Sequence, residues 1–474
     1  MTGRPNSIRR WPAPIKTPGH NRSLASGNPR RETSKIRRSG LCPATARRGY
    51  TLGPALDRQK PRQRPIMNSP QGAWRAMAFA GRRNRKDPLN PVLEEYGETG
   101  MIPVSGSGLM RKSIILFLVV VLGTALFFSC MHNPAPFDEA KWRRQVDAQS
   151  VEQLYAPHFN DGRYFNPWAP MEHGGFWRLV KWKMSSKAHY SEEEKNHRPK
   201  FIPELKARIQ GMPEGDFIAW IGHSTFLLRI GGDYWITDPI FSERAFLPRR
   251  ITPPAITGEE LKALAPSLNV LISHNHYDHL DEESVRSLPR ASRFYVPLGL
   301  GNHVASLHEG AVQELDWWRE IDLGGGNKLV CLPAQHWSRR FGQGFNETLW
   351  AGFLLITPEI SVYYGADSGY FIGYREIGRR YPNIHYALLS TTAYHPRWFM
   401  HYAHKSIPEA LDAFHDLGAR YFIPTQWGTF PLGDEPPGYP ALDLMRTIQE
   451  RKLDPSRFLV LDIGEIRPLR GARE

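Results

Sequence analysis

The hexapeptide HNHYDH at residues 274–279 constrains the fold and chemistry of this chain more than any other feature. It follows LNVLIS, an apolar run with the length of a short buried strand. Side chains alternate along an extended backbone, so His274 and His276 can face one ion while Asp278 and His279, a turn later, face a second. Imidazole and carboxylate groups suit Zn²⁺ and similar divalent ions. The alternative is a His-rich surface turn without metal, which the preceding strand disfavours.

Other apolar, strand-like runs also end in polar residues that can bind a metal. KLVCLPAQ is followed by His336, VYYGA is followed by Asp367, and the run YFIPTQ ends at Gln426. If these strand ends meet His274 at one sheet edge, the four side chains lie in one cleft. Strand ends are rigid supports, which a metal site needs in order to hold its ligands in place.

The order of the runs predicts a layered fold. From about residue 215, runs rich in β-branched and aromatic residues alternate with turn signals and a few helices. We predict a hairpin from two such runs, DFIAWIGHSTFLLRI and DYWITDPIF, which are joined by Gly231 and Gly232. SIPEALDAFHDLG predicts a helix with Ser406 as N-cap and Gly418 as C-cap. Strands outnumber helices, and helices come between groups of strands, so we expect an α/β sandwich.

The net charge of +14 comes from the first 109 residues. They contain 21 Lys and Arg against 6 Asp and Glu, whereas the remainder is balanced at 40 against 41. This segment has no apolar period and cannot bury enough apolar surface to offset its ordering entropy. We interpret residues 1–109 as a disordered tail or an extension from a miscalled start codon. The alternative is an arm for nucleic acid, which the lack of an aromatic stacking platform disfavours, so we expect no nucleic-acid partner.

A second N-terminal segment, residues 110–132, has the character of a signal. MRKSIILFLVVVLGTALFFSC begins at Met110 with a basic stretch and continues with an apolar run of about 15 residues. Ser129 before Cys130 resembles a bacterial lipoprotein signal with Cys130 as the lipidated residue, although two bulky phenylalanines precede the serine. An uncleaved membrane anchor is the alternative. Both interpretations place the rest of the chain, residues 133–474, at a membrane of the bacterial cell envelope.

Seven motifs occur in an order that identifies a family. They are WIGHSTFLLRI, ITDPIFSERA, VLISHNHYDHLD, YVPLGL, ELDWW, QHWSRR and PRWFMHYAHKSIPEA. Together they resemble the N-acyl-phosphatidylethanolamine-hydrolysing phospholipase D family of the metallo-β-lactamase superfamily, including its bacterial members, over Phe165 to Glu465. The resemblance implies an αβ/βα four-layer sandwich, two zinc ions at the sheet edge, and hydrolysis of a phosphodiester in a phospholipid.

The resemblance also implies a ligand set. The first zinc would be held by His274, His276 and His336, the second by Asp278 and His279, with Asp367 bridging the two. Two ions would acidify a bridging water, and the hydroxide would attack phosphorus. Asp278 would orient that hydroxide, so Asp278 and Asp367 are the expected catalytic residues. We expect His223 and Asp238 to support the ligands from behind; the alternative for each is a local cap or turn role.

Gln426 departs from the family pattern, which has histidine before the Trp-Gly-Thr-Phe motif. An amide oxygen is a weaker donor for zinc than imidazole. Three interpretations are open: a weakened but active second site; a single metal or a harder ion such as Mn²⁺ or Fe²⁺; or a non-catalytic module. We favour the first, because the other ligands are retained. Gln426, His395 and His404 are therefore candidate weak metal or substrate contacts.

Other residues allow two interpretations each. One aromatic set either lines a lipid groove or, as is more common for clustered aromatics, forms part of the core; it consists of PRWFM, Trp317, Trp318 and Tyr394. Arg249 and Arg250 in LPRRITPP either contact lipid phosphates or are simply solvated.

The favoured function is a metal-dependent phosphodiesterase that acts on phospholipids of the N-acyl-phosphatidylethanolamine type. One alternative is a lactonase or nuclease of the same fold, and a nuclease is disfavoured by the neutral body of the chain. The other is a non-catalytic lipid-binding or regulatory protein. The expected partners are the phospholipid and a membrane surface, and a homodimer is left open.

The charge boundary generates a first prediction. A protein that begins at Met110 should localise and act like the full chain, because the basic segment has neither a folding pattern nor a binding motif. Membrane fractionation and an activity assay of the two proteins, expressed side by side, check this. Loss of membrane association or activity in the shorter protein would restore a role for residues 1–109.

Overall fold

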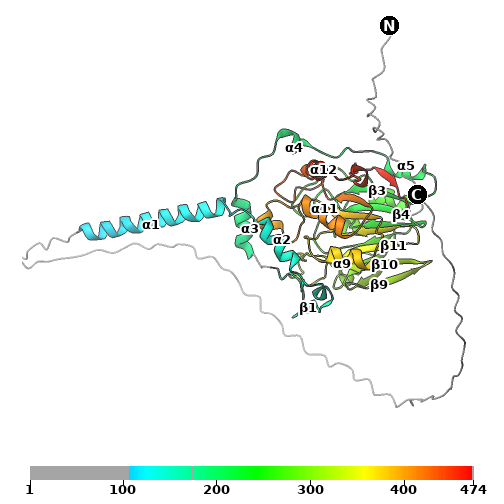
Figure 1. Ribbon diagram of the computed structural model, residues 1–474, viewed down its shortest axis with the longest axis horizontal. Coiled ribbons are helices and arrows are strands. Elements are labelled where there is room, and N and C mark those ends of the chain that lie inside the picture. Colours follow the sequence, from blue (N-terminus) through cyan, green and yellow to red (C-terminus); the bar gives the residue numbers. More distant parts are fainter. Residues whose placement is uncertain (1–105, 172–174, 472–474) are drawn as a thin grey trace, which may run out of the picture. The chain divides into compact units, whose positions relative to one another are not determined.

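The computed structural model describes residues 106–171 and 175–471 (Figure 1). Residues 1–105, nearly all of the predicted basic segment, lie outside the described residues, as does the side chain of Cys130. The description that follows therefore concerns the candidate signal segment and the predicted hydrolase domain.

The first sheet has seven strands in the order β15-β3-β4-β5-β6-β7-β8. The strands are β3 (Phe217–Gly222), β4 (Thr225–Ile230), β5 (Asp233–Thr237), β6 (Asn269–Leu271), β7 (Arg293–Pro297), β8 (Ala311–Leu315) and β15 (Ile466–Pro468). Pairing is antiparallel from β15 to β5 and parallel from β5 to β8. The C-terminal ends of β5 and β6 therefore lie side by side.

The second sheet has six strands in the order β14-β13-β12-β11-β10-β9. The strands are β9 (Glu320–Gly324), β10 (Asn327–Leu332), β11 (Gly352–Ile356), β12 (Ser361–Tyr364), β13 (Tyr386–Ser390) and β14 (Tyr421–Thr425). β11 is antiparallel to β10 and β12, while β12, β13 and β14 are parallel. Consequently β10, β12, β13 and β14 all end at the same edge of this sheet.

The two sheets face each other across the core. Apolar side chains from both sheets, including Leu228 and Trp235 of the first and Leu355 and Leu388 of the second, line one small gap between them. α11 packs on β13 and is flanked by α9 and α12 (Figure 1). α8 packs on β8. Helices thus cover the outer faces of both sheets, and the predicted αβ/βα sandwich is confirmed.

The helices are short apart from the first. They are α1 (Gly106–His132), α2 (Glu139–Asp147), α3 (Gly175–Met184), α4 (Glu192–Asn196), α5 (Leu205–Gln210), α6 (Gly258–Leu264), α7 (Glu282–Arg286), α8 (Gly301–Leu307), α9 (Gly373–Arg380), α10 (Arg397–Met400), α11 (Ile407–Asp416) and α12 (Tyr439–Glu450). The short 3-10 helices Val151–Tyr155 and Pro455–Arg457 and the small hairpin of β1 (Phe159–Asn160) and β2 (Arg163–Tyr164) complete the described elements.

Local sequence signals account for α11. Ser406 and Glu409 form a capping box, in which each side chain accepts a hydrogen bond from the other residue's backbone N–H. Gly418, just beyond the last turn, has a left-handed φ of 62°. The predicted helix is confirmed at both ends, with Leu417 as its C-cap residue and Gly418 one position later.

One predicted strand is in fact two. DFIAWIGHSTFLLRI turns at Gly222 and His223, so β3 and β4 form a hairpin of their own, and β4 then pairs with β5 across Gly231 and Gly232. His223 has a left-handed φ of 52°, which is uncommon for a side chain with a Cβ although less so for histidine than for most residues. It lies in the Gly-His-Ser-Thr stretch, residues 222–225, that interrupts the apolar run. The turn brings His223 to the end of the sheet where the polar residues gather.

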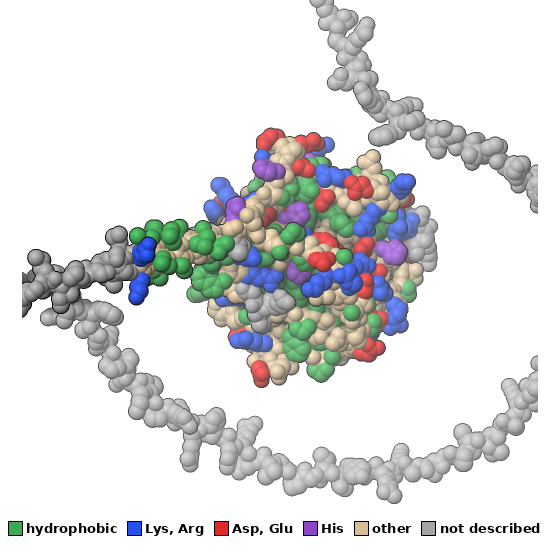
Figure 2. All heavy atoms as spheres, turned by 60° about the vertical axis from the view of Figure 1, so that its left-hand side comes forward, with side chains coloured by type: hydrophobic (Ala, Val, Ile, Leu, Met, Phe, Trp, Pro, Cys, Tyr) green, Lys and Arg blue, Asp and Glu red, His purple; other side chains and the backbone are tan. Residues whose placement is uncertain are grey.

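α1 contains the apolar run predicted to be a signal or anchor, and its side chains from Ile114 to Leu122 are exposed (Figure 2). Its last residue accepts a hydrogen bond at its carbonyl oxygen from the backbone N–H of Ser186, 2.9 Å away. Within the described ranges, no helix combines the length and the apolar character needed to cross a membrane.

Candidate metal centre

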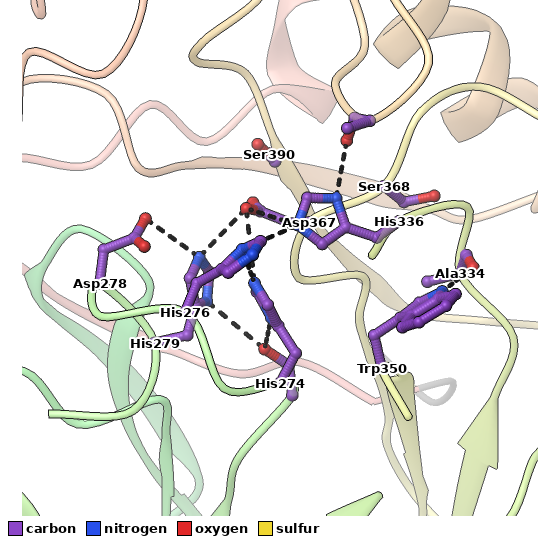
Figure 3. Close-up of polar contacts among 12 residues, drawn as sticks. His274, His276, Asp278, His279, Ala334, His336, Trp350, Asp367, Ser368 and Ser390 are labelled. Carbon is purple, nitrogen blue, oxygen red and sulfur yellow. Dashed lines mark hydrogen bonds and ion pairs between the residues drawn. The ribbon is translucent and has the colours of Figure 1, made fainter. Parts of the chain in front are cut away.

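The ends of strands from both sheets bring the predicted ligands together. His274 follows β6 of the first sheet, whereas His336, Asp367 and Gln426 follow β10, β12 and β14 of the second. The sequence led us to expect one sheet edge, and this was wrong: the cleft lies where the edges of two facing sheets adjoin. Figure 3 shows the imidazoles and carboxylates converging from these two directions.

Four residues form a first group of candidate metal ligands: His274, His276, His336 and Asp367. His276 Nδ1 lies 2.9 Å from His274 Nε2 and 3.2 Å from His336 Nε2. Asp367 Oδ2 lies 3.6 Å from His336 Nε2 and 3.9 Å from His274 Nε2. This is the predicted first-ion set.

A second group combines His279 and Asp278 with His223. His279 Nε2 is 3.3 Å from Asp278 Oδ2, and it is also 3.3 Å from Asp367 Oδ2. Asp367 thus reaches both groups, as expected of a bridging residue. His223 Nε2 is 3.0 Å from Asp278 Oδ2, so this histidine contacts Asp278 as a supporting residue would and also stands among the grouped candidate ligands.

Hydrogen bonds on the far side of the rings determine which nitrogens carry hydrogen. His279 Nδ1 donates to Asp238 Oδ2 at 2.6 Å, and His336 Nδ1 donates to the carbonyl oxygen of Ala403 at 3.2 Å. Because a carboxylate and a carbonyl can only accept, each neutral ring presents an unprotonated Nε2 to the cleft. Asp238 therefore has the predicted supporting role, since it orients His279 from behind.

Ser273 extends this support to His274. Its hydroxyl donates to Asp238 Oδ2 at 2.5 Å, and its oxygen is 2.9 Å from His274 Nδ1. The hydroxyl hydrogen is used by Asp238, so His274 Nδ1 acts as the donor in the second contact, and its Nε2 also faces the cleft with a lone pair. Neither Ser273 nor Tyr364, whose hydroxyl also donates to Asp238, was identified from the sequence.

These atoms fit a divalent cation. The unprotonated Nε2 atoms of His274 and His336 both face His276 Nδ1, and Nε2 of His279 faces carboxylate oxygens of Asp278 and Asp367. Lone pairs this close to one another repel unless a cation or a proton lies between them. Four ligands bound tetrahedrally at about 2.0–2.1 Å would be about 3.3 Å apart. The measured separations of 2.9–3.9 Å bracket that spacing.

Burial and the neighbouring candidate ligands also shift the pKa values of these histidines. Burial and neighbouring imidazoles hold the pKa of His274 well below its usual value, and burial does the same for His336 although Asp367 opposes it. Burial would also lower the pKa of His279, but Asp367, Asp278 and Asp238 outweigh it and raise that pKa well above normal. The imidazoles of the first group are thus neutral near pH 7, while the acidic surroundings of His279 favour positive charge.

Gln426 occupies the position of the missing histidine. Its amide nitrogen is 2.6 Å from Asp367 Oδ1 and 3.2 Å from His279 Nε2, while its oxygen accepts from the hydroxyl of Ser390 at 2.5 Å. In this arrangement the amide donates to the bridging carboxylate and turns its oxygen away from the cleft. To act as a metal ligand through oxygen, the amide would have to rotate and release Ser390.

The two further histidines differ in position. The His404 ring lies 5.4 Å from that of His336, and its Nδ1 has no hydrogen-bond partner among the described residues. His395 instead bonds Tyr190 through Nδ1 at 2.8 Å and belongs to neither ligand group. His404 therefore stays a candidate contact, and the structure does not bring His395 to the cleft.

The aromatic residues that could have lined a groove are divided between the core and partly buried positions, and Trp398 and Phe399 of PRWFM are partly buried. Trp317 and Tyr394 are buried, and the Trp317 ring packs against Trp168 and Trp350. Trp318 is partly buried and stacks on Tyr155. Instead, the ring of Trp337, which follows His336, lies 4.3 Å from that of His276 and so is the aromatic side chain beside the candidate metal ligands.

Comparison with known proteins places the chain among metal-dependent hydrolases. A family model described as "Beta-lactamase superfamily domain" matches residues 234–427. The N-acyl-phosphatidylethanolamine-hydrolyzing phospholipase D 1 of Caenorhabditis elegans is 31% identical over 272 residues, covering 53% of this chain and 75% of that protein. An uncharacterized protein of Mycobacterium tuberculosis is 32% identical over 321 residues, covering 63% of this chain and 82% of its own. A metallo hydrolase structure from Ignicoccus hospitalis has a TM-score of 0.42 at 20% identity, covering 54% of this chain and 98% of that one.

The asymmetry at Gln426 generates a prediction about metal content. The wild-type protein should retain close to one ion per chain after mild chelation, because the first group is complete and the second lacks an imidazole. Gln426→His should raise retention toward two, with second-ion affinity about 10–100-fold higher. Mass spectrometry of bound metal after dialysis against chelator measures this, with Gln343→His as a control outside both groups. Two ions retained by the wild type would show that another residue, such as His223 or His404, completes the second site.

A second prediction concerns the support from Asp238. Asp238→Asn can donate an N–H to His279, which would favour the wrong tautomer and turn the Nε2 lone pair into an N–H facing the cleft. Second-ion affinity should fall about 10–100-fold while the ion held by the first group is less affected. Titration of metal-free protein with Co²⁺, followed by absorption spectroscopy, separates the two binding steps. Equal weakening of both steps would show that Asp238 supports the first group, through Ser273 and His274, as strongly as it supports the second.

Proposed function

This chain belongs to the metallo-β-lactamase superfamily, a family of metal-dependent hydrolases, and we propose that it is a phosphodiesterase acting on phospholipids of the N-acyl-phosphatidylethanolamine type. In this proposal water cleaves the bond between phosphorus and the ethanolamine oxygen, giving an N-acylethanolamine and a phosphatidic acid. The expected cofactor is zinc, with two ions in the family arrangement and the second bound more weakly because of Gln426; Mn²⁺ or Fe²⁺ is the alternative.

The observation that carries the proposal is the pair of ligand groups joined by Asp367. His274, His276 and His336 with Asp367 would hold the first ion, and Asp278 and His279 with Asp367 the second. Divalent ions bound there would polarise a phosphoryl oxygen and acidify water. Two cationic positions a few ångströms apart suit a phosphodiester, whose charge is shared by two non-bridging oxygens.

The chain's own residues would position the water and the substrate. The carboxylate of Asp278 accepts a hydrogen bond from His223, and this bond orients the carboxylate toward the cleft. We assign Asp278 to hold the attacking water. Burial of His223, whose side chain has no exposed surface, keeps that bond out of solvent. Arg340 holds the surrounding loop in place by donating to the carbonyl oxygens of Leu280 at 2.8 Å and Asn275 at 3.2 Å.

Apolar residues around the cleft support a lipid substrate. Trp337 lies beside His276 and stacks on Phe345, and Tyr277 of the HNHYDH segment stacks on the exposed ring of Phe246 at 4.6 Å. Phe341, next to these residues along the chain, is almost fully exposed. Acyl chains pack on such surfaces, whereas a small polar substrate would gain nothing from them.

We also propose that the protein works at a membrane surface of the bacterial cell envelope. α1 exposes a long apolar face, and α3 exposes Phe176, Trp177 and Met184 beside Lys183. Aromatic and apolar side chains mixed with cations are typical of segments that lie in the lipid interface. The lipoprotein interpretation of Cys130 stays part of this proposal.

The function is tested by an assay on N-acyl-phosphatidylethanolamine in mixed micelles with metal-loaded protein. Product should form, and His276→Ala and Asp278→Asn should each lower turnover by about a hundredfold or more, because each removes a candidate ligand. Circular dichroism checks folding, and His415→Ala, on the exposed surface, is the matched control. Full turnover in either ligand variant would contradict the metallohydrolase assignment.

The same assay separates the alternatives. Metal-loaded protein that binds lipid without product formation would point to the non-catalytic module. In that case the hydrogen bond from the Gln426 amide would keep Asp367 from acting as a ligand. Turnover of lactones but not of the phosphodiester would identify the lactonase.

A further inference from the structure

A surface pocket of about 520 Å³ lies on the loop that follows β5, away from both candidate ligand groups. Both ends of the loop line it, with Phe241 and Glu243 from one end and Arg249, Arg250 and Thr252 from the other. The loop is held closed by a hydrogen bond from the backbone N–H of Arg250 to the carbonyl oxygen of Glu243, 2.9 Å away. These are the two arginines whose role the sequence left undecided.

The arginines differ in their partners. Arg249 is exposed and forms an ion pair with Glu243. Arg250 is mostly buried, and no carboxylate within the described residues forms an ion pair with it. Its two terminal nitrogens make only long contacts of 3.4 Å with the carbonyl oxygens of Phe241 and Ile240, and its buried Nε has no partner in that part of the chain.

A buried guanidinium without a counter-ion is costly, because its desolvation is not repaid. Burial lowers the pKa of Arg250 to about 10, although Asp281 acts in the opposite sense. Guanidinium still carries its charge at pH 7, so the pocket is lined by a positive charge whose terminal N–H groups have only the two long carbonyl contacts. Planar donor pairs of this kind match the oxygens of a phosphate group.

The surroundings of the pocket are those of a membrane interface. Phe246 and Leu247, at the tip of the same loop, expose 61% and 72% of their surface, and Ile251 beside the pocket exposes 38%. Arg244 and Arg249 flank this apolar tip. An apolar tip between cations is the pattern by which peripheral proteins insert a loop among phospholipid head groups.

The pocket is separate from the metal centre but connected to it. The Arg250 guanidinium lies over the Phe430 ring at 5.3 Å, and the Phe430 ring lies 5.1 Å from that of His223. The loop tip reaches the HNHYDH segment through the stacked rings of Phe246 and Tyr277. A head group bound at Arg250 would therefore lie beside the cleft without occupying it.

We propose that this pocket binds the phosphate of a second, anionic phospholipid, which holds the loop at the membrane while another lipid enters the metal cleft. Arg250 supplies the charge and the paired donors, and the apolar tip supplies the contact with acyl chains. This binding site goes beyond the proposed hydrolysis and involves no bond cleavage, so it can be tested whether or not the protein turns over substrate.

The test compares Arg250→Gln with Arg249→Gln in the full, metal-loaded chain. Co-sedimentation measures binding to vesicles of phosphatidylcholine with and without phosphatidylglycerol. Arg250→Gln should weaken binding to the anionic vesicles about tenfold or more, because a charged hydrogen-bond donor pair is lost, and the loss should persist at high salt. Arg249→Gln should cost about fivefold at most, and salt should remove that effect because the residue is exposed.

Thermal melting in the presence of inorganic phosphate provides the second arm. In phosphate-free buffer Arg250→Gln should melt no lower than the wild type, since an unpaired buried charge has been removed, and phosphate should stabilise it less than the wild type. Unchanged vesicle binding by Arg250→Gln would overturn the proposal. So would a large drop in its melting temperature without phosphate, which would make Arg250 structural. Phosphate stabilisation that depends on Arg250 without any effect on vesicle binding would identify a free-anion site and overturn the lipid assignment.

Discussion

The buried carboxylate of Asp238 is the interaction on which the candidate site depends. Its side chain has no exposed surface, so its charge must be compensated by donors from the protein. Those donors are Ser273 and His279 from the first half of the domain and Tyr364 from β12 in the second sheet. One acid thus joins the edges of both sheets and, in the same contacts, determines the orientation of His279 and, through Ser273, that of His274.

This arrangement explains how much of the site the sequence could predict. Residues next to apolar strands, such as His336 and Asp367, were predictable because the alternation of buried strands and polar ends is a local pattern. The side of each ring that faces the cleft was not predictable, because it depends on Ala403, Ser273 and Tyr364, which are distant in sequence or unremarkable in type. The assumption of a single sheet edge failed for the same reason: pairing between β5 and β6 and between β12 and β13 is settled by long-range contacts.

His223 illustrates a further limit. Its position depends on a left-handed backbone at a hairpin turn. The Gly-His-Ser-Thr stretch marks an interruption of the apolar run but does not determine the geometry of that turn. The turn is supported from outside the hairpin, since the backbone N–H of His223 donates to the hydroxyl of Thr429 and its carbonyl oxygen accepts from the backbone N–H of Gln426. The residue that replaces the family histidine is therefore bonded to the turn that presents another histidine to Asp278.

Gln426 makes two contacts here, and only the side-chain one depends on its being glutamine. Its side-chain amide donates a hydrogen bond to Asp367 Oδ1, while its backbone N–H donates to the carbonyl oxygen of His223. An imidazole at this position would be a candidate ligand beside the Asp367 carboxylate, whereas the amide donates a hydrogen bond to that carboxylate and makes it a weaker donor to a cation. The first group keeps its three imidazoles, and hydrogen bonds with Ser273 and Ala403 already turn the Nε2 lone pairs of His274 and His336 toward the cleft. We therefore expect the weaker binding at the second group, where His223 orients the remaining acid, Asp278.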